Sequence, residues 1–143
     1  MSKKVWFMSR ALFETLIPDN ESAFISIFTP GCSPAKAAGR NWIAGLVWCR
    51  ADDEMPMDQR EVRMIANFVE TWRQHDFVVH CDAGISRSAA VAQYIGAVLD
   101  REVIGLDSDG LHANAVIKAS LMHHLWETQF KEDHIERLVF KKT

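Results

Sequence analysis

FVVHCDAGISRS, residues 77–88, is the stretch of sequence that decides the fold. Its apolar start predicts a short buried strand over residues 77–80. Residues 86–99, SRSAAVAQYIGAVL, are apolar on nearly every side, which is typical of a helix packed in the interior. The residues from Cys81 to Arg87 span the turn between strand and helix. A strand that leads through a short turn into a buried helix indicates an α/β fold.

The same alternation of strand and helix continues on both sides of this stretch. Further strands are predicted over residues 5–8, 23–28 and 43–49, with a helical turn over residues 10–16. One helix begins at Asp58, where Asp58 and Glu61 form a capping-box-like pair, and a last long helix runs from Asn114 to about Phe130. We therefore expect an α/β fold whose small, largely parallel central sheet has about four to five strands flanked by helices. Sites in such sheets form at the carboxyl ends of strands, where Cys81 lies.

Composition and charge indicate an ordinary soluble domain. The chain has 143 residues, 48% hydrophobic and 24% charged, and a formal net charge of −3. Residues 1–143 have the length of a single domain, and no linker or repeat divides them. The three cysteines are sparse and odd in number, as in a reducing compartment. We therefore expect a cytoplasmic protein, with neither nucleic acid nor a membrane as partner.

The loop that follows Cys81 has the chemistry of an anion site. A tight loop before a helix N-terminus points successive backbone N–H groups at one place, and Gly84 permits a close approach to an anion. These dipoles favour the thiolate form of Cys81. The guanidinium of Arg87 can bind two oxygens of a tetrahedral oxyanion. A thiolate beneath a bound phosphate predicts phosphoryl transfer through a cysteinyl-phosphate.

HCDAGISRS, residues 80–88, resembles the signature His-Cys-x-x-Gly-x-x-Arg-Ser/Thr of the cysteine-dependent protein tyrosine phosphatases. It is most similar to the compact dual-specificity branch. The resemblance implies a tyrosine-phosphatase-like fold in which Cys81 is the nucleophile, Arg87 binds phosphate and stabilises the transition state, and Ser88 helps the cysteine sulfur to leave. His80 would hold the loop from behind and would not act as a base. The amides that would cradle the phosphate belong to Asp82, Ala83, Gly84, Ile85, Ser86 and Arg87.

The resemblance also implies a general acid and a bracing asparagine. The acid is an aspartate on a loop about 30 residues before the cysteine, where Asp52 and Asp53 follow a predicted strand. Alignment of the strand ends favours Asp53, and alignment of the following helix favours Asp52. The family often has a Pro-Asn pair at the start of a late helix, whose asparagine braces the phosphate loop. Asn114 fits this place, but Ala113 precedes it, and a plain N-cap role is an equal alternative.

The expected protein is a metal-independent, cofactor-free phosphomonoesterase that acts as a monomer on phosphorylated proteins or peptides. One alternative is a phosphatase for phosphoinositides or RNA 5′ ends. Such enzymes usually carry lysines in the loop, and this loop has none. A second alternative is a non-catalytic module that binds phosphorylated partners. A separate hypothesis places Cys49 near Cys81, where oxidation would join them in a protective disulfide.

Overall fold

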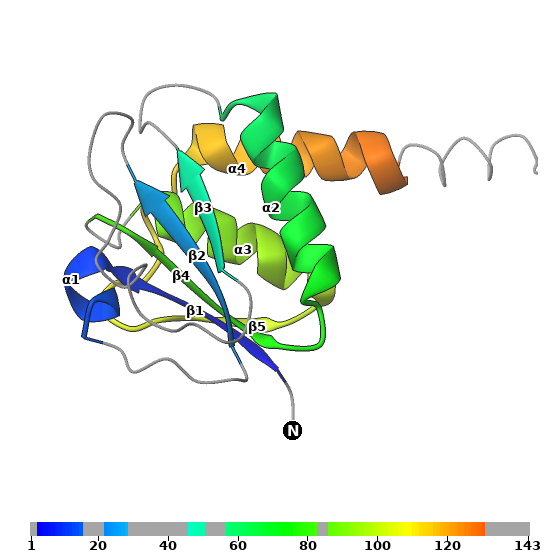
Figure 1. Ribbon diagram of the computed structural model, residues 1–143. Coiled ribbons are helices and arrows are strands. Elements are labelled where there is room, and N and C mark those ends of the chain that lie inside the picture. Colours follow the sequence, from blue (N-terminus) through cyan, green and yellow to red (C-terminus); the bar gives the residue numbers. More distant parts are fainter. Residues whose placement is uncertain (1–2, 16–21, 29–45, 51–56, 83–85, 131–143) are drawn as a thin grey trace, which may run out of the picture.

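The computed structural model describes residues 3–15, 22–28, 46–50, 57–82 and 86–130 (Figure 1). Five strands form one sheet in the order β3-β2-β4-β1-β5, and every neighbouring pair is parallel. The α/β fold with a small parallel sheet of about four to five strands is therefore confirmed. The strands are β1 (Lys4–Ser9), β2 (Ser22–Phe28), β3 (Leu46–Arg50), β4 (Asp76–Cys81) and β5 (Glu102–Gly105).

Three of the described helices lie between successive strands of the chain, and a fourth follows the last strand (Figure 1). They are α1 (Arg10–Phe13), α2 (Gln59–Thr71), α3 (Arg87–Leu99) and α4 (Ala115–Leu125). The last predicted helix reaches Phe130 as expected, but its final segment, η2 (Trp126–Phe130), is wound as a π-helix. Within the described ranges, no helix has the length and apolar character needed to cross a membrane.

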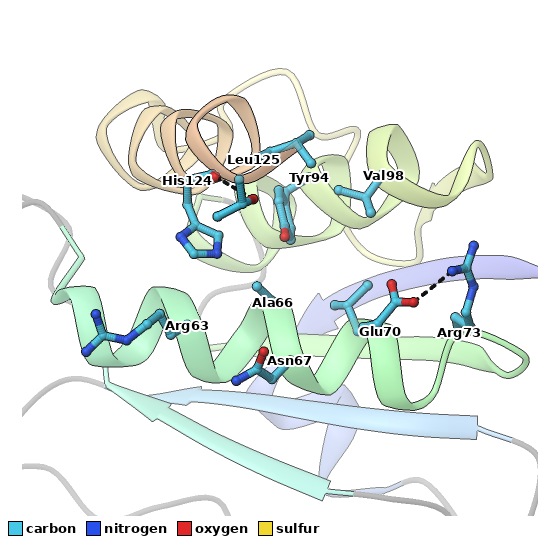
Figure 2. Close-up of a pocket in the computed structure, with 11 residues that line it drawn as sticks. Arg63, Ala66, Asn67, Glu70, Arg73, Tyr94, Val98, His124 and Leu125 are labelled. Carbon is cyan, nitrogen blue, oxygen red and sulfur yellow. Dashed lines mark hydrogen bonds and ion pairs between the residues drawn. The ribbon is translucent and has the colours of Figure 1, made fainter. Parts of the chain in front are cut away.

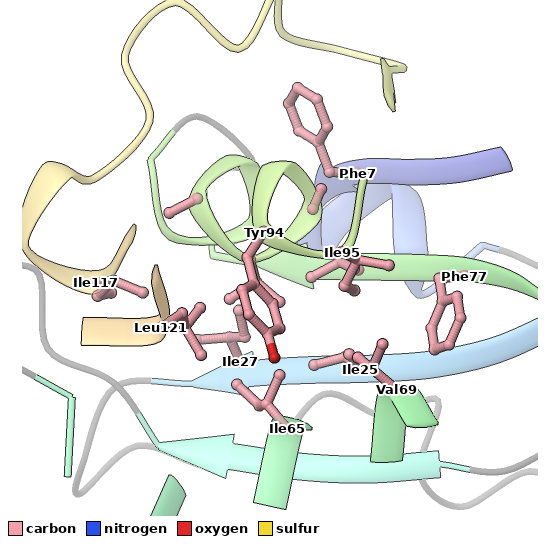
Figure 3. Packing of buried hydrophobic residues seen from close by; sticks show 14 of the residues in the cluster. Phe7, Ile25, Ile27, Ile65, Val69, Phe77, Tyr94, Ile95, Ile117 and Leu121 are labelled. Carbon is pink, nitrogen blue, oxygen red and sulfur yellow. The ribbon is translucent and has the colours of Figure 1, made fainter. Parts of the chain in front are cut away.

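The sheet has a different core on each face, because successive side chains of a strand point to opposite sides. Phe77, Val79 and Cys81 of β4 belong to the large core that α2, α3 and α4 complete, part of which Figure 3 shows. Val78 belongs to a smaller core that includes Phe13 of α1. Cys81 and His80 are consecutive residues, so their side chains lie on opposite faces of the sheet.

Helix α2 buries one apolar face and corrects part of its predicted cap. Val62, Ile65 and Val69 are fully buried at helical spacing. The Asp58 carboxylate accepts a hydrogen bond from the Arg60 amide at 2.7 Å and so caps the helix. Glu61 does not complete a capping box, since its Oε2 atom is buried and has no hydrogen-bond partner among the described residues.

Strand β5 has no counterpart among the strands predicted from the sequence. It is an edge strand of four residues, paired only with β1 in the described sheet. Its last residue must be a glycine, because a Cβ atom on Gly105 would lie 1.9 Å from the Ser108 carbonyl oxygen. Residues 107–110 follow this strand, and Gly110 has a φ of +78°, which favours glycine.

Candidate active site

Cys81 ends the middle strand of the sheet and begins the predicted phosphate loop. Strand β4 lies between β2 and β1, and Cys81 pairs in register with Ser9. Cys81 is 2% exposed, and its thiol donates to Ser88 Oγ at 3.2 Å. The structure thus brings together the predicted nucleophile and the hydroxyl predicted to assist it. The contact crosses the loop, because Ser88 lies in the first turn of α3.

Helix α3 begins directly behind this loop and presents its N-terminus to it. Ser86 is the N-cap residue, and its side chain makes no capping hydrogen bond. Its carbonyl oxygen accepts from the Ala90 amide, so the helical pattern already starts there. A helix N-terminus concentrates partial positive charge and N–H donors, which suits an anion. Ala83, Gly84 and Ile85, predicted to supply further amides, lie outside the described residues.

Arg87 is a buried cation held by its own loop. Its side chain is 5% exposed, and Nη2 donates to Asp82 Oδ2 at 3.0 Å. The Asp82 side chain is 43% exposed. The sequence predicted that the Asp82 amide would face the phosphate, but it did not predict this ion pair. An oxyanion that binds Arg87 through two parallel hydrogen bonds would compete with the Asp82 carboxylate for the same donor.

Arg10 is a second cation at the site that sequence reasoning missed. Its amide donates to the Asp82 carbonyl oxygen at 3.2 Å, and its Nη1 atom lies 3.9 Å from Asp82 Oδ1. Its Nε atom donates to Glu14 Oε1 at 2.9 Å. Arg10 directly follows β1, and the carboxyl end of β1 lies beside Cys81. A prediction that these two strands are neighbours would therefore have placed Arg10 at the site.

His80 lies behind the loop, on the sheet face opposite the Cys81 side chain. It is 1% exposed, its ring stacks on Phe13 with centroids 4.1 Å apart, and Nε2 is hydrogen-bonded to Ser26 Oγ. Nδ1 lies 3.4 Å from the Cys81 carbonyl oxygen. Burial lowers the pKa of His80 from 6.5 to about 4. The neutral His80 ring thus contacts the backbone of Cys81, at the start of the predicted phosphate loop. This position is compatible with the predicted role of holding the loop from behind.

The side chain of Asn114 caps α4, and its backbone contacts the residue that ends the predicted phosphate loop. Its Oδ1 atom accepts hydrogen bonds from the Val116 and Ile117 amides, each at 3.0 Å, and so caps α4. Its own amide donates to the Ser86 carbonyl oxygen at 2.9 Å. The start of α4 is thereby tied to the N-cap of α3, at the end of the phosphate loop. The donor of this hydrogen bond is the backbone amide of Asn114, so the bond does not require a proline at the preceding position, where this chain has Ala113.

The acid candidates Asp52 and Asp53 lie outside the described residues. The proposed disulfide can be judged from the backbone. Cys49 pairs with Ile27 of β2, and the register that pairs Ser26 with His80 places Ile27 beside Cys81. Two strand spacings separate the Cys49 and Cys81 Cα atoms by about 10 Å. Disulfides usually need less than about 7 Å, so this bond requires backbone movement.

Comparisons of the chain with protein-family models, with curated proteins and with solved structures found no match. The chemistry of the site therefore rests on the residues at the end of β4 and the start of α3.

Proposed function

We propose that the protein is a cysteine-dependent phosphatase of the tyrosine-phosphatase type, with phosphorylated proteins or peptides as substrates. The observation that carries the proposal is the meeting of Cys81, Ser88 and Arg87 at one strand–helix junction. A thiol 3.2 Å from a serine hydroxyl and a buried guanidinium at a helix N-terminus are the groups that a covalent phosphoryl transfer requires.

In the proposed first step, the Cys81 thiolate attacks phosphorus, the sulfur–phosphorus bond forms, and the bond from phosphorus to the leaving oxygen breaks. The leaving oxygen takes a proton from a carboxylic acid, for which Asp53 and Asp52 are the candidates. Arg87 and the amides at the start of α3 stabilise the charge on the equatorial oxygens. Binding of the phosphate displaces the Asp82 carboxylate from Arg87.

In the second step, water attacks phosphorus, the carboxylate left by the first step takes a proton from this water, and the sulfur–phosphorus bond breaks. Inorganic phosphate leaves, and the electron pair returns to sulfur. The Ser88 hydroxyl then donates to the thiolate, in the direction opposite to the hydrogen bond that a protonated Cys81 donates to Ser88. His80 remains neutral at the pH of turnover and keeps the loop backbone in place.

The choice of protein substrates rests on the charge of the loop. Asp82 is exposed and negative, and a polyanionic head group would meet it directly. A phosphomonoester on a peptide brings fewer charges to this place. Phosphotyrosine is the leading substrate, and phosphoserine or phosphothreonine is the alternative within the same class.

Turnover of para-nitrophenyl phosphate tests the proposal. Wild-type protein should release para-nitrophenol, and Cys81→Ser, which keeps the size of the side chain, should not. Activity that persists in Cys81→Ser would refute the mechanism. Absence of turnover in the folded wild type, with phosphopeptide binding retained, would support the non-catalytic binding module instead.

A further inference from the structure

The Asp82 carboxylate lies between two arginine side chains at the start of the predicted phosphate loop. Its Oδ2 atom accepts from Arg87 Nη2 at 3.0 Å, and its Oδ1 atom lies 3.9 Å from Arg10 Nη1. The first contact is a hydrogen bond, whereas the second is longer than a hydrogen bond. The two oxygens of one carboxylate thus face two different cations, and the closer cation is the one that phosphate would bind.

The backbone fixes Asp82 beside Arg10. The Arg10 amide, at the start of α1, donates to the Asp82 carbonyl oxygen at 3.2 Å. Strands β1 and β4 end side by side, with Ser9 in register with Cys81, so the residues that follow these strands are neighbours. The Asp82 side chain is 43% exposed, which leaves room for it to rotate. The carboxylate can therefore approach Arg10 by side-chain rotation, without movement of the main chain.

The Arg10 guanidinium is itself held in place. Its Nε atom donates to Glu14 Oε1 at 2.9 Å, and both side chains are about three-quarters buried. This bond engages Nε, while Nη1 faces Asp82. A guanidinium carries five N–H donors in one rigid plane. Arg10 can therefore bind Glu14 and Asp82 at the same time.

The charges of this cluster give the displaced carboxylate a reason to turn. Arg10 and Arg87 are positive, and Glu14 and Asp82 are negative, so the four side chains are neutral together. A phosphate that binds Arg87 brings further negative charge next to Asp82. The displaced carboxylate is then repelled by phosphate, and closer contact with Arg10 offsets this repulsion.

We propose that Arg10 is a positioning residue for phosphate binding. As phosphate takes Arg87, the Asp82 carboxylate turns to Arg10, and the ion pair between them shortens from 3.9 Å to hydrogen-bonding distance. Arg10 does not contact phosphate and acts only through Asp82. This inference rests on the phosphate site of the proposed function, and it names the residue that makes Arg87 available to the substrate.

A double-mutant cycle measured by calorimetric titration with orthophosphate tests this role. Arg10→Gln should weaken phosphate binding about fourfold in the wild-type background, which is the effect expected of a partly exposed ion pair. In Asp82→Asn, which has no carboxylate to turn, the same change should weaken binding less than about 1.5-fold. Arg10→Lys keeps the positive charge and should weaken binding less than Arg10→Gln does.

Arg63→Gln is the matched control, because it removes the same charge from an arginine outside the cluster. Arg63 lines a cavity of about 450 Å³ between α2, α3 and α4, to which no described residue of the phosphate loop contributes (Figure 2). Arg63→Gln should leave the phosphate affinity unchanged, and Arg87→Met should abolish saturable binding. These two results together would assign the bound phosphate to the loop. Thermal unfolding establishes that each variant is folded before its affinity is compared.

Equal weakening by Arg10→Gln in the wild type and in Asp82→Asn would overturn the proposal, because Arg10 would then act on phosphate directly. Unchanged affinity in Arg10→Gln, or an equal loss in Arg63→Gln, would overturn it as well. Absence of phosphate binding to the folded wild type, or binding that Arg87→Met retains, would refute both this proposal and the phosphate site. The expected coupling without turnover of para-nitrophenyl phosphate would support the role of Arg10 and refute the proposed phosphatase alone.

Discussion

Replacement of Asp82 by asparagine should make the protein bind phosphate more tightly while it becomes less stable. In the ligand-free structure, the Asp82 carboxylate holds Arg87 Nη2 at 3.0 Å, and phosphate must take this donor from it. An asparagine side chain at this position would be neutral and nearly the same size. The variant therefore removes the competitor without removing the cation.

The size of the effect follows from the exposure of the pair. Two unit charges 3.0 Å apart attract by at most about 5.5 kcal/mol at the effective dielectric constant of a protein surface. Asp82 is 43% exposed, however, and ion pairs with exposed partners contribute about 1 kcal/mol or less. Removal of an ion pair worth about 1 kcal/mol should raise the affinity for phosphate about fivefold. The same loss should lower the free energy of unfolding by about 1 kcal/mol, since Arg87 stays buried.

Calorimetric titration with orthophosphate at neutral pH measures the affinity, and denaturant unfolding measures the stability. Asp100→Asn is the matched control. It removes the same charge at the far end of α3, where the residue has a φ of 53° that asparagine also adopts. Phosphate affinity that is unchanged or weaker in Asp82→Asn would refute the competition between Asp82 and phosphate.

Three further changes address the supports of the loop. Ser88→Ala should slow breakdown of the cysteinyl-phosphate about tenfold and leave the initial burst of para-nitrophenol intact. Ser88→Thr retains the hydroxyl and is the control. Equal slowing of this breakdown in both variants would contradict the role of the hydroxyl. The lowered pKa of His80 disfavours protonation in the folded state, so its contribution to stability is complete above pH 6.5 and is lost toward pH 4. This contribution of His80 to stability amounts to as much as about 3 kcal/mol. The free energy of unfolding, measured with denaturant, should therefore depend less steeply on pH in His80→Asn than in the wild type. Asn114→Ala should cost about 1 kcal/mol of stability through loss of the α4 cap, and Asn114→Asp should restore it; unfolding free energies that do not separate these two variants would count against the cap.

The sequence was sufficient for the parts of the fold that depend on local pattern. The alternation of apolar strands and helices predicted the parallel sheet, and the apolar run before Cys81 predicted the end of β4. Strand β5 was missed because its four residues are only partly buried at the sheet edge, so they form no strong apolar run. The cap of α4 at Asn114 was found because N-caps are set by residues adjacent in sequence.

The contacts that sequence reasoning missed join distant segments or depend on the path of a loop. Ser26 meets His80 only because β2 and β4 are neighbours in the sheet, 54 residues apart in sequence. Arg10 reaches Asp82 for the same reason, through β1 and β4. The Asp82–Arg87 pair spans the loop itself. The charges of the two residues permit this pair, but only the path of the backbone between them decides whether it forms.

Mass spectrometry after a rapid denaturing quench tests most directly whether Cys81 accepts the phosphoryl group. Protein quenched during turnover of para-nitrophenyl phosphate should contain a peptide with one phosphoryl group on Cys81. The modified fraction should rise in Ser88→Ala, in which the intermediate breaks down more slowly, and should be absent in Cys81→Ser. Turnover without a phosphorylated Cys81 in both the wild type and Ser88→Ala, or with the phosphoryl group on another residue, would contradict the account.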